Sequence, residues 1–121
     1  MAGLRPKRLA EQIQREVAAI IDFKVKDPRK GMITITGVNL TNDLSLARIK
    51  YTAVDRAGNP DSETAQTVLE HAAGFIRHEL AQVLRVRVIP ELRFKYDDSM
   101  DKIRHIDGLI NRIHSEDDRH S

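Results

Sequence analysis

The residues of this chain best placed to do chemistry are cations, which gather in or beside segments with helical periodicity. Lysine and arginine neutralise the phosphates of a nucleic acid and release its counterions, so binding depends strongly on salt and little on base sequence. Contacts to RNA phosphates are therefore predicted for three groups of residues: Arg5, Arg8 and Arg15; Lys24, Lys26, Arg29 and Lys30; and Arg77, Arg85 and Arg87.

The first two groups also have a purely structural explanation. Arg5, Arg8 and Arg15 lie roughly opposite the apolar stripe of their helix, so they would form a solvated face, which is the simpler interpretation for an isolated helix. The cluster from Lys24 to Lys30 follows the end of the same helix, where positive charge interacts favourably with the helix dipole. The residues alone leave both interpretations open.

No catalytic or metal site is predicted. Asp101 and His105 lie four residues apart, near Asp97 and Asp98, and such a group could bind a metal ion. An exposed acidic helix start is the preferred interpretation, because carboxylates there interact favourably with the helix dipole. The sequence contains neither a glycine-rich phosphate loop nor a nucleophile motif. We therefore expect no enzymatic activity, no metal, no cofactor and no small-molecule substrate.

The composition fits one small domain. The chain has 121 residues, of which 40% are apolar and 31% are charged, and it contains no cysteine, so disulfide bonds are excluded. No apolar run approaches the roughly 20 residues that span a bilayer. We therefore expect a cytoplasmic protein without membrane contact. Because no long apolar surface demands a partner chain, we also expect a monomer.

The charges are unevenly distributed along the chain. Residues 1–60 carry eleven Lys and Arg against six Asp and Glu, a balance of +5, whereas residues 97–121 carry four against seven, a balance of −3. A basic N-terminal half indicates an anionic partner, and nucleic acid is the commonest one.

Apolar periodicity predicts the order of the elements. Steps of three and four residues predict helices over about 5–24, 61–84 and 99–113. Alternation predicts a β-hairpin from Met32 to Ala53 and a third strand after Pro90, with a β-bulge at Gly37, where the alternation slips. Three strands with helices packed on one face form a two-layer α+β domain. We assign residues 1–113 to this domain and residues 114–121 to a polar, disordered tail.

Gly74 lies in the middle of the central predicted helix, beside Ala72 and Ala73. A glycine inside a helix lowers the stability of the helix by roughly 1 kcal/mol relative to alanine, so the presence of Gly74 requires an explanation. Either a neighbouring element packs so closely that a side chain would collide with it, or the helix breaks or kinks and exposes its backbone. The residues alone do not choose between the two. Phe75, next in the sequence, is expected in the core.

A resemblance to a known family rests on four segments, which are Asp27–Gly31, Asp43–Ala47, Ala72–Arg77 and Pro90–Asp97. In this order and spacing they are similar to the ribosome-binding factor A family, bacterial assembly factors of the small ribosomal subunit. The resemblance covers roughly residues 5 to 113. It implies a type II KH-like domain with the element order α-β-β-α-kink-α-β.

The resemblance also implies a partner and a role. It predicts a non-enzymatic factor that binds the immature small (30S) ribosomal subunit and its 16S rRNA and assists late maturation. It favours the kink interpretation of Ala72, Ala73 and Gly74, since the family has an Ala-x-Gly kink where ordinary KH domains have a Gly-x-x-Gly loop. Two alternatives are a generic KH-like module that binds single-stranded RNA and a protein-interaction module that uses the exposed edge of the hairpin.

Overall fold

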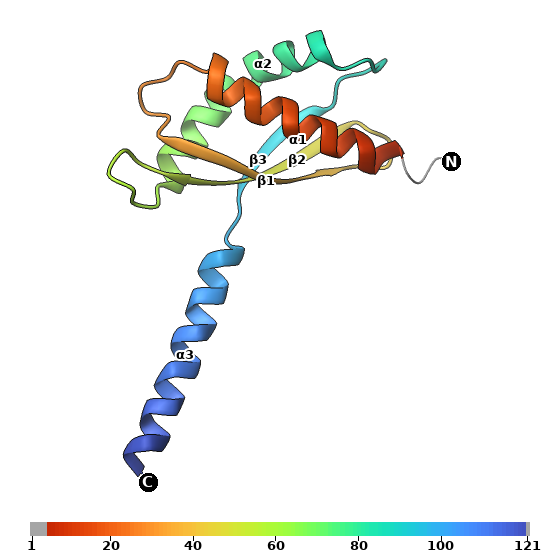
Figure 1. Cartoon of the computed structure of the whole chain (residues 1–121). Coiled ribbons are helices and arrows are strands. Elements are labelled where there is room, and N and C mark those ends of the chain that lie inside the picture. The colour runs from red at the N-terminus through yellow and green to blue at the C-terminus, as the bar shows by residue number, and fades with distance from the viewer. Residues whose placement is uncertain (1–4, 121) are drawn as a thin grey trace.

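The computed structural model describes the backbone of residues 5–120 and the side chains of residues 6–110. The elements follow one another as α1 (Arg5–Lys24), β1 (Met32–Leu40), β2 (Leu46–Val54), α2 (Ser62–Val83), β3 (Glu91–Tyr96) and α3 (Ser99–His120). Figure 1 shows their arrangement.

Helix α1 forms because its apolar residues recur on one face. Leu9, Ile13, Val17, Ile20 and Ile21 are all buried, which confirms the predicted stripe. The helix ends at Lys24, shortly before Pro28, and the chain then turns back at Gly31, whose φ is 60°. Only glycine adopts this conformation readily. A Cβ at Gly31 would also collide with the carbonyl oxygen of Val54.

Strands β1 and β2 form the predicted antiparallel hairpin. Ile35 pairs with Tyr51 and Gly37 pairs with Lys50, so Thr36 is an extra residue in β1. This register shift confirms the bulge predicted from the slip at Gly37.

Helix α2 carries the chain from β2 across to β3. Its first turn is capped by Asp61, whose side chain accepts a hydrogen bond from the Thr64 backbone N at 3.1 Å. Strand β3 then pairs with β2 in parallel, with Leu46 opposite Glu91 and Tyr51 opposite Tyr96. The parallel pair requires such a crossover, because a short turn cannot join parallel strands.

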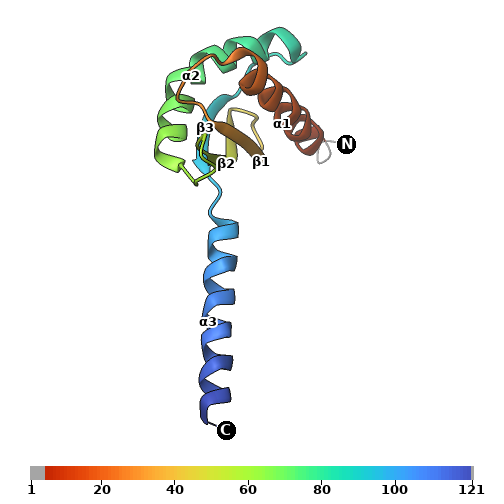
Figure 2. The same cartoon turned by 60° about the vertical axis from the view of Figure 1, so that its left-hand side comes forward.

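The sheet has the order β1-β2-β3, and α1 and α2 cover one of its faces while the other face stays open (Figures 1 and 2). Strand residues that point toward the helices form the core, among them Ile33, Ile35, Ala47, Ile49, Tyr51, Ala53, Leu92 and Phe94. Tyr51 is fully buried, and its hydroxyl donates to the Gln66 side chain. Burial raises the pKa of Tyr51 to about 12. The predicted two-layer α+β architecture is confirmed.

Helix α3 extends away from the open side of the sheet (Figures 1 and 2). The Tyr96 hydroxyl donates a hydrogen bond to the Asp101 side chain at 3.1 Å, which links the start of α3 to β3. The apolar side chains of the described part of α3 are exposed: Met100, Ile103, Ile106, Leu109 and Ile110.

The end of α3 differs from the sequence prediction. The apolar pattern predicts a helix that ends at residue 113, whereas the backbone remains helical to His120. The physical reason is that no proline follows Ser99 and no glycine follows Gly108 to stop the helix. The division of the chain into a domain of residues 1–113 and a tail of residues 114–121 stays a prediction.

Candidate nucleic-acid interface

A shallow groove of about 670 Å³ lies between the segment that follows α1 and helix α2. One wall consists of residues 24–29, and the other is formed by Val68, His71, Ala72 and Phe75. The groove therefore places cations opposite an aromatic ring. Cations attract phosphates and an aromatic ring offers a stacking surface to a base, so this groove has the chemistry of a nucleic-acid contact.

Phe75 lies at the groove rather than in the core. Its side chain is 43% exposed, while the neighbouring Ile76 is fully buried. The prediction that Phe75 belongs to the core is wrong, because Ile76 and Leu80 already occupy the face of α2 that packs on the sheet. The consequence is one aromatic surface available on the same wall as His71.

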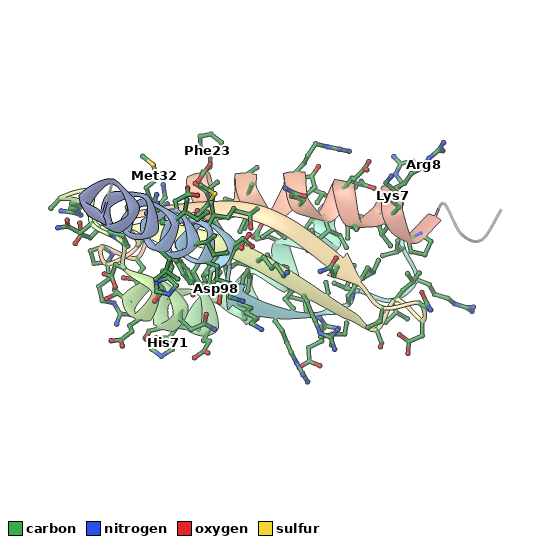
Figure 3. The ribbon with its side chains drawn as sticks, turned by 90° about the horizontal axis from the view of Figure 1, so that it is seen from below. Lys7, Arg8, Phe23, Met32, His71 and Asp98 are labelled. Carbon is green, nitrogen blue, oxygen red and sulfur yellow. The ribbon has the colours of Figure 1, made fainter. Side chains whose placement is uncertain are left out.

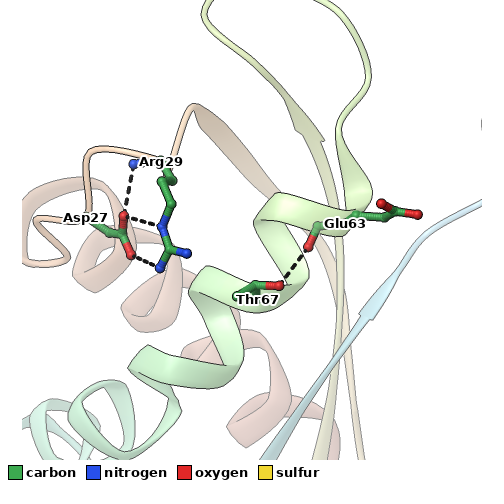
Figure 4. A network of polar contacts seen from close by, with 4 residues as sticks. All are labelled: Asp27, Arg29, Glu63 and Thr67. Carbon is green, nitrogen blue, oxygen red and sulfur yellow. Dashed lines mark hydrogen bonds and ion pairs between the residues drawn. The ribbon is translucent and has the colours of Figure 1, made fainter.

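Arg29 carries its own counterion at the groove. Its guanidinium donates to the two carboxylate oxygens of Asp27 at 2.9 and 3.1 Å, and its backbone N donates to the same carboxylate at 2.9 Å (Figure 4). These hydrogen bonds lower the pKa of Asp27 to about 2. A phosphate bound by Arg29 would therefore compete with Asp27 for the guanidinium.

Two lysines of the predicted cluster also make internal contacts. Lys24 Nζ lies 2.8 Å from Glu79 Oε2, which links the end of α1 to the second half of α2. Lys30 Nζ donates to the carbonyl oxygens of Ile21, Asp22 and Val25 at 2.8, 3.3 and 3.3 Å.

Lys26 differs from both. It is exposed, and within residues 6–110 its ammonium makes neither an ion pair nor a hydrogen bond to another side chain. Of the four cations in the predicted cluster, Lys26 thus has the charge that is most readily available to a partner.

The outer face of α1 carries the arginines predicted for it. Arg8 and Arg15 are exposed, and the side chain of Arg5 lies outside the described residues. Lys7 is also exposed and lies beside Arg8 at the N-terminal end of α1, with Phe23 at the other end (Figure 3). Sequence reasoning missed Lys7, although its position directly before Arg8 was an available signal.

The third predicted group does not join the groove. Arg77 donates from Nη2 to the carbonyl oxygen of Ile89 at 2.8 Å and from Nε to that of Pro90 at 3.2 Å, so it holds the segment between α2 and β3. Arg85 and Arg87 are exposed on that segment and are not among the lining residues of the groove.

Helix α2 bends without breaking. It is assigned as one helix from Ser62 to Val83, and its axis changes direction near the middle (Figures 1 and 2). A Cβ added at Gly74 would meet no atom within 4 Å outside the local helix backbone, so the close-packing interpretation of Gly74 is wrong. The structure thus has one bent helix rather than two helices separated by a gap (Figure 1), and the position of the kink at Ala72, Ala73 and Gly74 stays a prediction.

Sequence reasoning also missed four cations on the open face of the sheet. They are Arg48 and Lys50 on β2, and Arg93 and Lys95 on β3, and all four are exposed. The alternation of each strand places them on the solvent side, but only the pairing register reveals that Arg48 lies opposite Arg93 and Lys50 opposite Lys95. We call this group the sheet patch.

Within the described residues, no three His, Cys, Asp or Glu side chains gather in a way that could hold a metal ion. None of the helices in that part of the chain is both long enough and apolar enough to cross a bilayer.

Known proteins share both the sequence pattern and the fold. The family described as ribosome-binding factor A matches residues 5–110. The chain belongs to the ribosome-binding factor A family. A ribosome-binding factor A from Staphylococcus carnosus is 43% identical over 117 residues, which span 97% of this chain and 100% of the relative.

Two structures of ribosome-binding factor A from Thermus thermophilus are also similar. The first is a crystal structure with a TM-score of 0.67 and 28% identity, and the match covers 75% of this chain and 93% of that one. The second is a homology model fitted into a cryo-electron-microscopy map of a 30S complex of that protein. It has a TM-score of 0.61 and 27% identity over 74% of this chain and 91% of that one.

Proposed function

We propose that this protein is a non-enzymatic ribosome assembly factor that binds the immature small (30S) ribosomal subunit, contacts its 16S rRNA and assists late maturation. Membership of the ribosome-binding factor A family supports this role. The similar protein from Thermus thermophilus has been fitted into a map of a 30S complex, which supports the small subunit as the partner.

The observation that carries the proposal is the groove, which has a volume of about 670 Å³ and is lined by Lys24, Lys26 and Arg29 together with Phe75. A second basic surface consists of Lys7, Arg8 and Arg15, which are exposed on α1. Lys7 and Arg8 lie at the N-terminal end of this helix (Figure 3), whereas the groove begins at Lys24 at its C-terminal end. Such a surface binds phosphates without reading base sequence. The target is accordingly a folded rRNA surface rather than a short sequence.

Single-stranded recognition of the ordinary KH kind fits the chain less well. Ordinary KH domains clamp four nucleotides with a Gly-x-x-Gly loop, and this chain has a bent helix with Ala72, Ala73 and Gly74 at the corresponding place. Among the described residues, Phe23 and Phe75 are the exposed aromatic side chains. Since stacking on aromatic rings provides much of the affinity for single strands, few bases would be held in this way.

The test is co-sedimentation with precursor small subunits before and after nuclease treatment, together with binding to short single-stranded oligonucleotides. We expect association that nuclease abolishes, and negligible affinity for the oligonucleotides. Tight oligonucleotide binding would favour the generic KH-like module. Association that survives nuclease would favour the protein-interaction module and contradict the proposal.

A further inference from the structure

The sheet patch is a concentration of like charge on a face that no helix covers. Arg48 and Arg93 are direct neighbours across β2 and β3, as are Lys50 and Lys95. Residues two apart on a strand are separated by about 6.6 Å and paired strands by about 4.8 Å. The Cα atoms of the four cationic residues therefore lie at the corners of a rectangle of about 5 by 7 Å.

This arrangement is unfavourable for the protein alone. Like charges that lie directly opposite each other on a sheet are destabilising, and the patch has two such pairs. Its counterions within the protein are weak: Arg93 Nε lies 3.8 Å from Glu91 Oε1, with both side chains about two-thirds exposed. A surface pair of this kind contributes little.

A second carboxylate near the patch, that of Asp97, makes its hydrogen bonds to residues outside the patch, and these bonds and the charge of Lys50 both lower its pKa. Asp97 accepts a hydrogen bond from the Ser99 backbone N at 3.0 Å and another from the Thr36 hydroxyl at 2.7 Å. Arg48, Lys50 and Lys95 make no ion pair within residues 6–110. The patch therefore keeps most of its charge for an external anion.

The chemistry around the cations favours double-stranded RNA. Thr34 and Thr52 are paired neighbours on β1 and β2, and Thr52 follows Lys50 on the same side of its strand, so hydroxyls border the charges. No exposed aromatic residue occurs within β1, β2 or β3, so bases have nothing to stack on. Duplex RNA is recognised through its phosphates and 2′-hydroxyls, and cations flanked by hydroxyls match both.

We propose that the open face of the sheet is a second RNA contact, in which Arg48, Lys50, Arg93 and Lys95 bind the phosphates of a double-stranded rRNA segment. The inference rests on the proposed function in one respect, namely that the RNA is ribosomal. The groove and the sheet patch belong to opposite sides of the sheet, since α1 and α2 cover one face only (Figure 2). The protein would then contact RNA on two sides.

The test is a salt titration with a labelled RNA duplex of about 16 base pairs, the length that other duplex-binding domains span. The variant is Arg48→Gln/Lys50→Gln/Arg93→Gln/Lys95→Gln, and Lys102→Gln/Arg104→Gln on α3 is the control for loss of surface charge. Each phosphate-binding cation contributes about 1 to the slope of log affinity against log salt. We expect the slope of the sheet variant to fall by about 4 and that of the control to stay near the wild-type value.

Folding is followed in parallel by thermal unfolding. Removing the two like-charged pairs should leave the Tm unchanged or raise it. If the fourfold variant fails to fold, Arg93→Gln/Lys95→Gln replaces it, with an expected fall in slope of about 2.

The outcomes separate this inference from the proposed function. A sheet variant with the wild-type slope overturns the sheet contact, even if the wild-type chain sediments with small subunits. A variant that loses subunit binding but keeps its duplex titration unchanged also overturns it, because the patch would then face a ribosomal protein. If the wild-type chain does not bind small subunits, the proposed function is refuted. If the sheet variant nevertheless loses duplex binding, the sheet remains supported as an RNA contact.

Discussion

The Nζ atom of Lys30 lies 2.8 Å from the carbonyl oxygen of Ile21, so a lysine that follows α1 in the sequence donates a hydrogen bond to the C-terminal end of that helix. The last carbonyls of a helix have no partner within the helix. Lys30 supplies one from outside, and its positive charge also interacts favourably with the negative end of the helix dipole. The lysine cluster after α1 therefore contains residues with different tasks.

Lys30→Gln should destabilise the fold more than it weakens RNA binding. The three carbonyl contacts of Lys30 are half-buried or exposed. Losing the charged donor to them costs about 1 to 2 kcal/mol, which urea denaturation measures. Lys26→Gln is the matched control, since Lys26 is exposed. It should leave stability unchanged and lower the salt slope of RNA binding by about 1. Equal stability of the two variants would contradict the task assigned to Lys30.

Gly74→Ala should stabilise the protein by about 0.5 to 1 kcal/mol, because alanine is a better helix former. The added Cβ meets no atom within 4 Å beyond the local helix backbone, so nothing offsets the gain. Gly31→Ala is the contrasting variant and should be strongly destabilising, since it has a positive φ and its Cβ would collide with Val54. A loss of stability in Gly74→Ala, measured by denaturation, would mean that the bend of α2 depends on the absence of a side chain at position 74.

Acid should weaken the fold through Asp97. Hydrogen bonds from Ser99 and Thr36 lower the pKa of its carboxyl from 3.8 to about 2. Because the folded pKa lies below the unfolded value, the stabilisation is complete above 3.8 and disappears as the pH falls toward 2. The Tm difference between wild type and Asp97→Asn should therefore shrink over that interval. A difference that stays constant with pH would contradict this assignment.

Removal of α3 should leave the rest of the fold intact. Residues 99–110 are exposed. The side-chain links that residues 6–110 show between α3 and the sheet are the Tyr96–Asp101 hydrogen bond and the Asp97 carboxylate, which accepts from both Ser99 and Thr36. A chain that ends at Asp98 should keep its Tm within a few degrees and its near-ultraviolet circular dichroism. A large fall in Tm would show that the apolar stripe of α3 packs on the domain in solution.

Local patterns in the sequence predicted the fold well. The stripe from Leu9 to Ile21 and the slip at Gly37 each depend on residues close together in the chain, so periodicity alone locates them. The crossover between β2 and β3 follows from the order of the elements.

Features that depend on distant residues were not predictable in this way. Arg48 and Arg93 become neighbours only through the parallel register of β2 and β3. Lys30 reaches Ile21 only because the chain turns between Asp27 and Lys30, where the Lys30 backbone N donates to the Asp27 carbonyl oxygen. Phe75 is exposed because Ile76 takes the core position on α2. Each of these depends on tertiary geometry that the spacing of residue types does not encode.

The most direct test of the account is the binding of Arg8→Glu/Arg15→Glu to precursor small subunits, with Lys102→Glu/Arg104→Glu as the charge-matched control. Both pairs are exposed on helices, so circular dichroism should be unchanged in each variant. We expect the α1 variant to bind the subunits at least about tenfold more weakly, which is a loss of about 1.4 kcal/mol in binding free energy. The control should bind nearly as well as the wild type. Wild-type binding by the α1 variant would contradict the predicted contact between α1 and the rRNA.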